Sequence, residues 1–274
     1  MQKNIDRKRI WKGVELALIL LLCGVTLLLD FLQFNYTQNQ LHNKYISKII
    51  QQGIGVLATV LLLKRLNVKV FGVPQQSLYL ILGLIVAIDN FQWSSFLNGK
   101  MELLYSTPLD FLLFGGYCLS VGMFEECIFR GIIFALLAGQ FSKDKSGLWK
   151  TYIVSSLIFA AAHLMNGLSF GTILQVGYTF LTGGLFGFIL MKTKNVLCCG
   201  VIHALYNFGG LLFETSEYMG LGKGVVFDLG TVITMFVVSV IAGVIVLYSV
   251  KKYTIEEQAE LYEKLGVSMK KQDE

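Results

Sequence analysis

The sequence predicts an all-α, polytopic membrane protein with about eight transmembrane helices. Hydrophobic residues make up 54% of the 274 residues and charged residues only 15%, and the mean hydropathy is +0.62. A soluble globule of this size needs more charge than that to cover its surface. The apolar residues also gather in long runs, and a run of roughly 18 or more is enough for a helix to cross a bilayer.

Eight apolar runs are candidate spans, at residues 14–32, 45–63, 77–97, 109–138, 151–164, 170–191, 196–213 and 225–250. The only two prolines, Pro74 and Pro108, fall just before the third and fourth runs. A missing amide proton is harmless there, because the first residues of a helix have no partner for it. No small-residue cleavage site follows the first run, so we expect a retained anchor rather than a secretory signal.

We expect residues 1–13 to form a cytosolic N-terminus, 14–250 a single transmembrane domain and 251–274 a cytosolic tail. The tail carries apolar residues at helical spacing, which predicts a short amphipathic helix at a solvated end, resting at most on the bilayer surface. No internal repeat or low-complexity linker divides the chain.

Lysine and arginine predict the orientation, because short cytoplasmic loops retain them. Eighteen of the 23 basic residues lie before the first span and after the second, fourth, sixth and eighth spans. Both termini are therefore expected on the cytoplasmic side of the plasma membrane. This topology accounts for the net charge of +5, so no nucleic-acid partner is predicted.

Ionisable residues are costly inside a bilayer and therefore mark candidate functional sites. The fourth run contains Glu125, Glu126 and Arg130. Three charges cost on the order of +7 to +10 kcal/mol, which nearly cancels what the apolar residues of the run contribute. Glu126 and Arg130 are four residues apart, with the acid first, so we expect them to pair along one helix face. Glu125 points about 100° away and is left as an unpaired carboxylate, suited to a general base.

Two of the three histidines, His163 and His203, also fall within apolar runs. A single histidine there is more often structural, but two on separate spans beside an unpaired glutamate on a third favour a site. Asn207 follows His203 by one helical turn and can donate hydrogen bonds, and Phe159 precedes His163 by one turn. Counted along the helices, the three ionisable groups lie about 10–20 Å below the cytosolic face.

These patterns together resemble the CAAX-protease and bacteriocin-processing (CPBP, or Abi) family. The matching residues are Glu125-Glu126 with Arg130, Phe159 with His163, and His203 with Asn207, in that order on successive apolar runs. A glycine-rich stretch that begins at Gly183-Gly184 lies between the second and third motifs and is also similar to the family. The resemblance covers about residues 108–210.

The resemblance implies an eight-helix fold with a CAAX-protease-like core that hydrolyses a peptide bond within the membrane. Glu125 would activate the water with help from His163, and His203 and Asn207 would stabilise the oxyanion. Glu126, Arg130 and Phe159 would support these groups. One carboxylate and two imidazoles also suit zinc, so Glu125, His163 and His203 are candidate ligands of a divalent metal.

Two other functions remain as alternatives: a subunit of an ion- or proton-coupled transporter, and a catalytically silent membrane scaffold. A carrier often shows two related halves, whereas all the motifs here lie in the second half. A scaffold has no need of an intact set of catalytic residues. The motifs leave open the substrate, a peptide precursor or a membrane-associated protein. They also leave open the oligomeric state and the biological role, such as bacteriocin processing or self-immunity.

Overall fold

The computed structural model describes Leu21 and residues 34–91, 93–99, 101–103, 105, 107–168, 170–215 and 229–268. The first predicted span, 14–32, lies outside these residues except for Leu21. The helices are α2 (Gln40–Arg65), α3 (Leu80–Asp89), α4 (Trp93–Leu97), α5 (Pro108–Glu126), α6 (Phe134–Gln140), α7 (Lys145–Ala162), α8 (Phe170–Thr193), α9 (Val196–Leu211), α10 (Leu229–Lys251) and α11 (Ile255–Lys264). Two short 3-10 helices, η1 (Ser77–Tyr79) and η3 (His163–Asn166), and one π-helix, η2 (Cys127–Ile133), complete the described helical segments.

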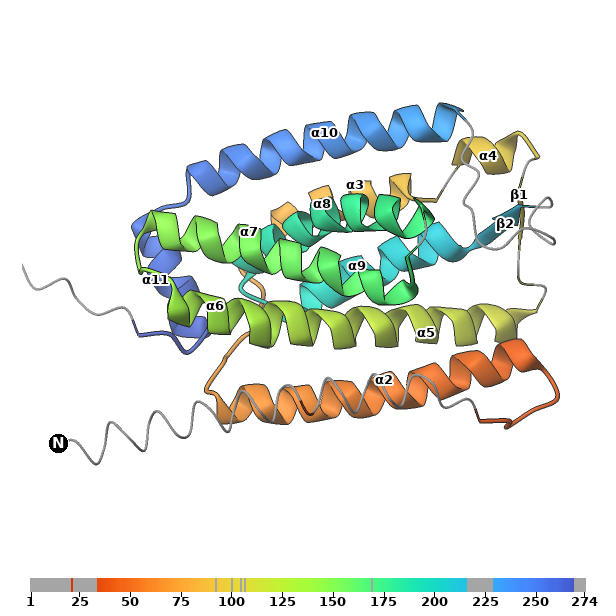
Figure 1. Ribbon diagram of the computed structural model, residues 1–274, viewed down its shortest axis with the longest axis horizontal. Coiled ribbons are helices and arrows are strands. Elements are labelled where there is room, and N and C mark those ends of the chain that lie inside the picture. Colours follow the sequence, from red (N-terminus) through yellow and green to blue (C-terminus); the bar gives the residue numbers. More distant parts are fainter. Residues whose placement is uncertain are drawn as a thin grey trace, which may run out of the picture.

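The helices lie roughly along one direction, with α2 and the α5–α6 rod on one side and α10 on the other (Figure 1). Between them lie α3, α7, α8 and α9, and α9 packs against both α5 and α3. Strands β1 (Met101–Leu103) and β2 (Phe213–Thr215) form one short antiparallel pair at the end away from α11. The prediction of an all-α membrane fold is confirmed.

Three of the described helices are long and apolar enough to cross a membrane: Gln40–Arg65, Lys145–Met165 and Ile233–Lys251. Two shorter apolar helices, Ser77–Asp89 and Val196–Leu211, lie among them. The predicted run 77–97 is broken, because α3 ends at Asp89 and α4 begins only at Trp93. Asn90 donates from its side-chain amide to the carbonyl of Tyr206 at 2.7 Å, which ties this break to α9.

Capping residues define the helices that carry the motifs. Thr107 and Asp110 form a capping box at the start of α5, with Pro108 in the first turn as expected from the sequence. Asp144 caps α7, which begins at Lys145, six residues before the predicted run. Asn195 accepts from the amide of Cys198 at 3.1 Å and so starts α9 immediately after α8 ends. The α8–α9 connection is therefore very tight.

A glycine brings α5 and α9 into close contact. A Cβ atom placed on Gly122 would lie 2.6 Å from the carbonyl oxygen of Gly200 and 2.8 Å from the amide nitrogen of Ala204. Both neighbours are backbone atoms of α9, which cannot rotate away. Small residues allow this kind of backbone approach between membrane helices. Gly122 lies one turn before the glutamates, so this contact sets their distance from α9.

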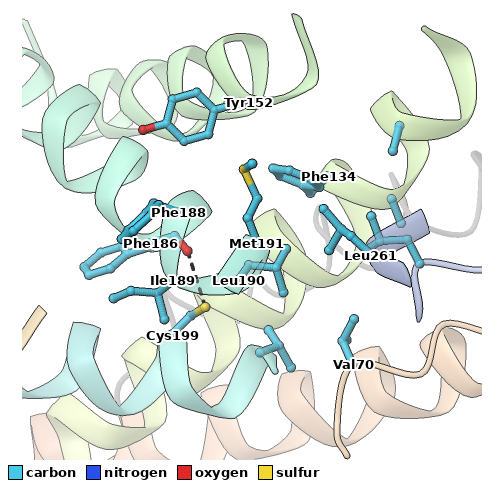
Figure 2. Packing of buried hydrophobic residues seen from close by; sticks show 14 of the residues in the cluster. Val70, Phe134, Tyr152, Phe186, Phe188, Ile189, Leu190, Met191, Cys199 and Leu261 are labelled. Atoms are coloured by element: carbon cyan, nitrogen blue, oxygen red, sulfur yellow. Dashed lines mark hydrogen bonds between the residues drawn. The ribbon is translucent and has the colours of Figure 1, made fainter. Parts of the chain in front are cut away.

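The central core is built around the second half of α8. Phe186, Phe188 and Met191 are buried there between α7, α9 and the loops at one end of the molecule (Figure 2). Cys199 on α9 contacts the Phe186 carbonyl at 3.4 Å through its thiol, and Tyr152 on α7 donates from its hydroxyl to the Gly184 carbonyl at 3.0 Å. The core therefore fixes α8 against both α7 and α9.

The C-terminal segment does form the predicted amphipathic helix, α11, with a capping box at Thr254. The expectation of a solvated end is wrong. Leu261 and Tyr262 are 0% exposed and Leu265 is 2% exposed, because the ends of the other helices cover the apolar stripe of α11. Amphipathic spacing identified the face to be buried, but not the surface that buries it.

The basic segments of the described chain meet around α11, as the orientation argument requires. The amide of Lys69 donates to the Lys264 carbonyl at 2.6 Å, and Gln258 donates to the carbonyls of Lys143 and Asp144. Lys192 pairs with Glu257 at 2.9 Å. Loops that follow the second, fourth, sixth and eighth predicted spans therefore share one end of the molecule. That this end faces the cytoplasm stays a prediction.

Candidate active site

The two glutamates close helix α5, and a π-helical segment follows them directly. Glu125 and Glu126 are the last residues of α5, and η2 then runs from Cys127 to Ile133 with Arg130 inside it. The sequence predicted a regular helix through this region. Single-turn π segments inside α-helices frequently accompany functional sites, because the wider turn changes the direction of the side chains.

Glu126 and Arg130 form the predicted ion pair. Arg130 donates from Nη1 to Glu126 Oε1 at 3.0 Å, with the two side chains 1% and 0% exposed. The other end of the guanidinium, Nη2, donates to the Gly183 carbonyl at 2.9 Å. The guanidinium also lies over the Phe159 ring, 4.3 Å from its centroid, and 5.3 Å from that of Phe186. Arg130 thus joins η2, α7 and α8.

The Gly183 carbonyl can be reached because this residue has no side chain. A Cβ atom at Gly183 would lie 3.0 Å from the Phe159 ring and 3.4 Å from Arg130 Nη2. The glycine-rich stretch was noted in the sequence, but its use as a hydrogen-bond acceptor was not predicted. A sequence pattern gives no sign of a backbone carbonyl acting as a ligand for a buried cation.

His203 is held by Glu126, a contact that the sequence did not predict. Its Nδ1 lies 2.9 Å from Glu126 Oε1, the same oxygen that binds Arg130, and the residue is 4% exposed. Because a carboxylate paired with arginine accepts hydrogen bonds, Nδ1 is the donor and Nε2 is left facing elsewhere. The imidazole stacks on Phe186 at 4.8 Å between centroids and meets the edge of Phe159 at 5.8 Å.

Glu125 lies beside the other nitrogen of this imidazole. Its Oε2 is 3.9 Å from His203 Nε2, beyond hydrogen-bond distance but within reach of one shared water-sized group. This oxygen is shielded from solvent and accepts no hydrogen bond from the described residues, while the whole side chain is 28% exposed. Glu125 therefore combines a sheltered oxygen with an accessible side chain.

His163 lies at the end of α7, where the helix tightens into η3. Its Nδ1 is 3.0 Å from the Phe159 carbonyl, and since a carbonyl only accepts, Nδ1 carries the proton and Nε2 is the nitrogen that can act as a base. The imidazole meets the Phe159 ring at 5.0 Å between centroids. Phe159 therefore contacts both imidazoles and Arg130. Asn207 lies one turn beyond His203 on α9 and is half-buried.

No three His, Cys, Asp or Glu side chains come together as a metal-binding group in the part of the chain that the structure describes. Glu125 and His203 are adjacent, but they form no such group with His163. The zinc site stays a prediction that this arrangement does not readily fit, and the chemistry of the site is described through its own side chains.

Comparison with known proteins gives one family match. Residues 107–209 match the family model described as Type II CAAX prenyl endopeptidase Rce1-like. This segment is similar to the CAAX-protease family. The Rce1-like segment begins at the Thr107 cap of α5 and ends just after Asn207, so it contains every candidate site residue. Neither a curated protein nor a solved structure matches the chain. The family indicates an endopeptidase of the CAAX type, embedded in the membrane.

Proposed function

We propose that the chain is an intramembrane endopeptidase that cleaves a peptide precursor or a membrane-associated protein by means of a glutamate-activated water. The observation that carries the proposal is the approach of Glu125 Oε2 to within 3.9 Å of His203 Nε2, in a buried region between α5 and α9. The two residues are 78 positions apart, and both lie in the segment that matches the family.

In this proposal Glu125 is the general base. Its sheltered oxygen takes a proton from the attacking water, and the free Nε2 of His163 orients that water or shares the proton. A carboxylate without hydrogen-bond donors is well prepared for this role, because no bond has to break before it accepts the proton. The proton then passes to the amine that leaves when the carbon–nitrogen bond breaks.

His203 and Asn207 would stabilise the negative charge that develops on the carbonyl oxygen of the substrate. With Nδ1–H donated to Glu126, His203 donates from Nε2 only when it carries both protons. Glu125 and Glu126 lie beside His203, and Arg130 pairs with Glu126, so these four groups are neutral overall when the imidazole carries both protons. Glu126 and Arg130 hold the ring in place, and Phe159 keeps water from reaching the pair.

We further propose the plasma membrane as the location, with both termini cytoplasmic, and a site that opens toward the cytoplasm. The clustering of basic loops around α11 supports this orientation. Bacteriocin or peptide maturation and self-immunity are roles that such an enzyme could serve.

The test compares membrane-associated peptides in cells carrying the parent chain, Glu125→Gln or His203→Ala. We expect a set of processed peptides that is present with the parent and absent with both variants. Expression levels and hydrogen exchange of the purified variants serve as folding controls. Unchanged peptides together with reduced ion or solute uptake would overturn the proposal in favour of a transporter.

A further inference from the structure

The C-terminal helix α11 binds two lysines that occupy the turn between α8 and α9. Lys192 and Lys194 are 5% and 3% exposed, although lysine is rarely buried without a partner. Their counter-charges come from α11: Lys192 Nζ lies 2.9 Å from Glu257 Oε1, and Lys194 Nζ pairs with Glu260 Oε2. The ammonium of Lys192 also lies 4.9 Å from the ring centroid of Tyr253 and 5.1 Å from that of Tyr79.

Each of the two carboxylates is held by a matching pair of groups. Besides its lysine, Glu257 accepts from the Gln76 amide at 3.1 Å, and Glu260 accepts from the Gln75 amide at 3.1 Å. The loop before α3 therefore supplies one glutamine for each glutamate. Glu257 and Glu260 lie about one helical turn apart on α11, and each binds its own lysine and glutamine. This pairing fixes the position of α11 along its own axis.

The turn that contains Lys192 and Lys194 connects α8 to α9, and both helices contribute residues to the candidate active site. Toward the N-terminus of α8, Gly183 lies nine residues before Lys192, about 14 Å along the helix, and its carbonyl binds Arg130. Toward the C-terminus of α9, His203 lies eight residues after the Asn195 cap, about 12 Å along the helix. A shift of this turn would therefore displace both Gly183, which binds Arg130, and His203, which binds Glu126.

We propose that α11 is a charge latch: Glu257 and Glu260 are positioning residues that lock the α8–α9 turn and so set the geometry of the site. Docking of α11 closes the latch, and release of α11 leaves Lys192 and Lys194 without counter-charges and frees the turn. The effect on activity rests on the proposed function, whereas the mechanical coupling between α11 and α9 does not.

The test uses Glu260→Lys, with Glu263→Lys as the matched control, because Glu263 is exposed on the same helix and undergoes the same change of charge. Hydrogen exchange is measured by mass spectrometry on the full-length protein in lipid vesicles. We expect exchange of α11 amides to be at least about tenfold faster in Glu260→Lys, since a buried lysine loses its partner. Exchange in α9 should rise with it, and the control should stay within about twofold of the parent.

The reciprocal variant Lys194→Glu/Glu260→Lys restores the pair with its charges exchanged. It should return α11 and α9 exchange toward the parent, and Glu125-dependent cleavage should fall in Glu260→Lys and recover in the reciprocal variant. Faster exchange of α11 with unchanged α9 exchange and unchanged cleavage would overturn the latch, as would unchanged α11 exchange in Glu260→Lys. If the parent shows no Glu125-dependent cleavage, the proposed function fails, and the exchange data still decide the coupling.

Discussion

Replacing Arg130 with methionine tests whether the buried ion pair organises the site. The substitution keeps an unbranched side chain of similar length, but it removes the two hydrogen bonds to Glu126 and to the Gly183 carbonyl. Glu126 is 0% exposed and, among the described residues, would keep only His203 as a partner. Removing one member of a buried pair costs about 3–5 kcal/mol, because the other charge stays buried.

For a chain of this size, that loss corresponds to a fall in Tm of roughly 6–20 °C. The assay is thermal unfolding of the purified protein in detergent micelles, followed by tryptophan fluorescence. Lys150→Met is the matched control, because it removes an exposed cation, and it should shift Tm by no more than about 2 °C. Arg130→Lys should not rescue stability, because a single ammonium cannot reach both Glu126 and Gly183 in the same geometry.

A double-mutant cycle sharpens the test. Glu126→Leu combined with Arg130→Met leaves no buried charge without a partner, so the double variant should be more stable than Arg130→Met alone. If Arg130→Met costs less than about 1 kcal/mol, or if lysine substitutes fully for Arg130, the pair is not the organising contact.

Other predictions concern the helix contact and the latch. Gly122→Ala places a Cβ against the α9 backbone, so we expect destabilisation of about 1–3 kcal/mol and at least a tenfold loss of cleavage. Gly53→Ala, where an added Cβ meets open space, should leave both unchanged or raise stability, and equal losses in the two variants would contradict the close-approach argument. Docking of α11 should weaken in acid, which 19F NMR of a fluorotyrosine at the buried Tyr262 would detect as a solvent-exposed signal. A signal that stays buried at a pH low enough to protonate both Glu257 and Glu260 would count against the latch.

The sign of the acid effect follows from the carboxylates of α11. The Lys194 ammonium and the Gln75 amide beside Glu260 hold the pKa of that carboxyl below its ordinary value. Burial works to raise the pKa of Glu257, but hydrogen bonds from the Thr254 amide, Lys192 and Gln76 outweigh it, and the pKa of Glu257 is also lowered. A lowered folded-state pKa stabilises docking above the ordinary carboxyl pKa of about 4.3, and that stabilisation is lost as the pH falls through the lowered values.

Much of the site could be predicted because its ionisable residues lie within apolar runs of the sequence, where charged side chains are energetically costly. Glu125, Glu126 and Arg130 interrupt an apolar run, and their spacing alone predicted the Glu126–Arg130 pair that the structure contains. The caps at Thr107 and Asn195 are local, so they too can be recognised in the sequence.

The remaining features depend on contacts between distant segments. The bond from His203 to Glu126 joins residues 77 positions apart, and the apolar pattern around Arg130 does not distinguish the π-helical η2 from a regular helix. The docking of α11 depends on lysines 65 and 66 residues away along the chain. Periodicity shows which side of a helix is apolar, but it does not show which partner covers that side.

The most direct test of the account is hydrolysis by the purified chain in lipid vesicles prepared in water enriched in 18O. A peptide that disappears from membranes in a Glu125-dependent way is supplied as substrate, and its products are analysed by mass spectrometry. Hydrolysis through a Glu125-activated water predicts one 18O atom in the new carboxyl terminus with the parent chain and no product with Glu125→Gln. Equal cleavage by both chains would contradict the account, because the carboxylate beside His203 would then have no part in the reaction.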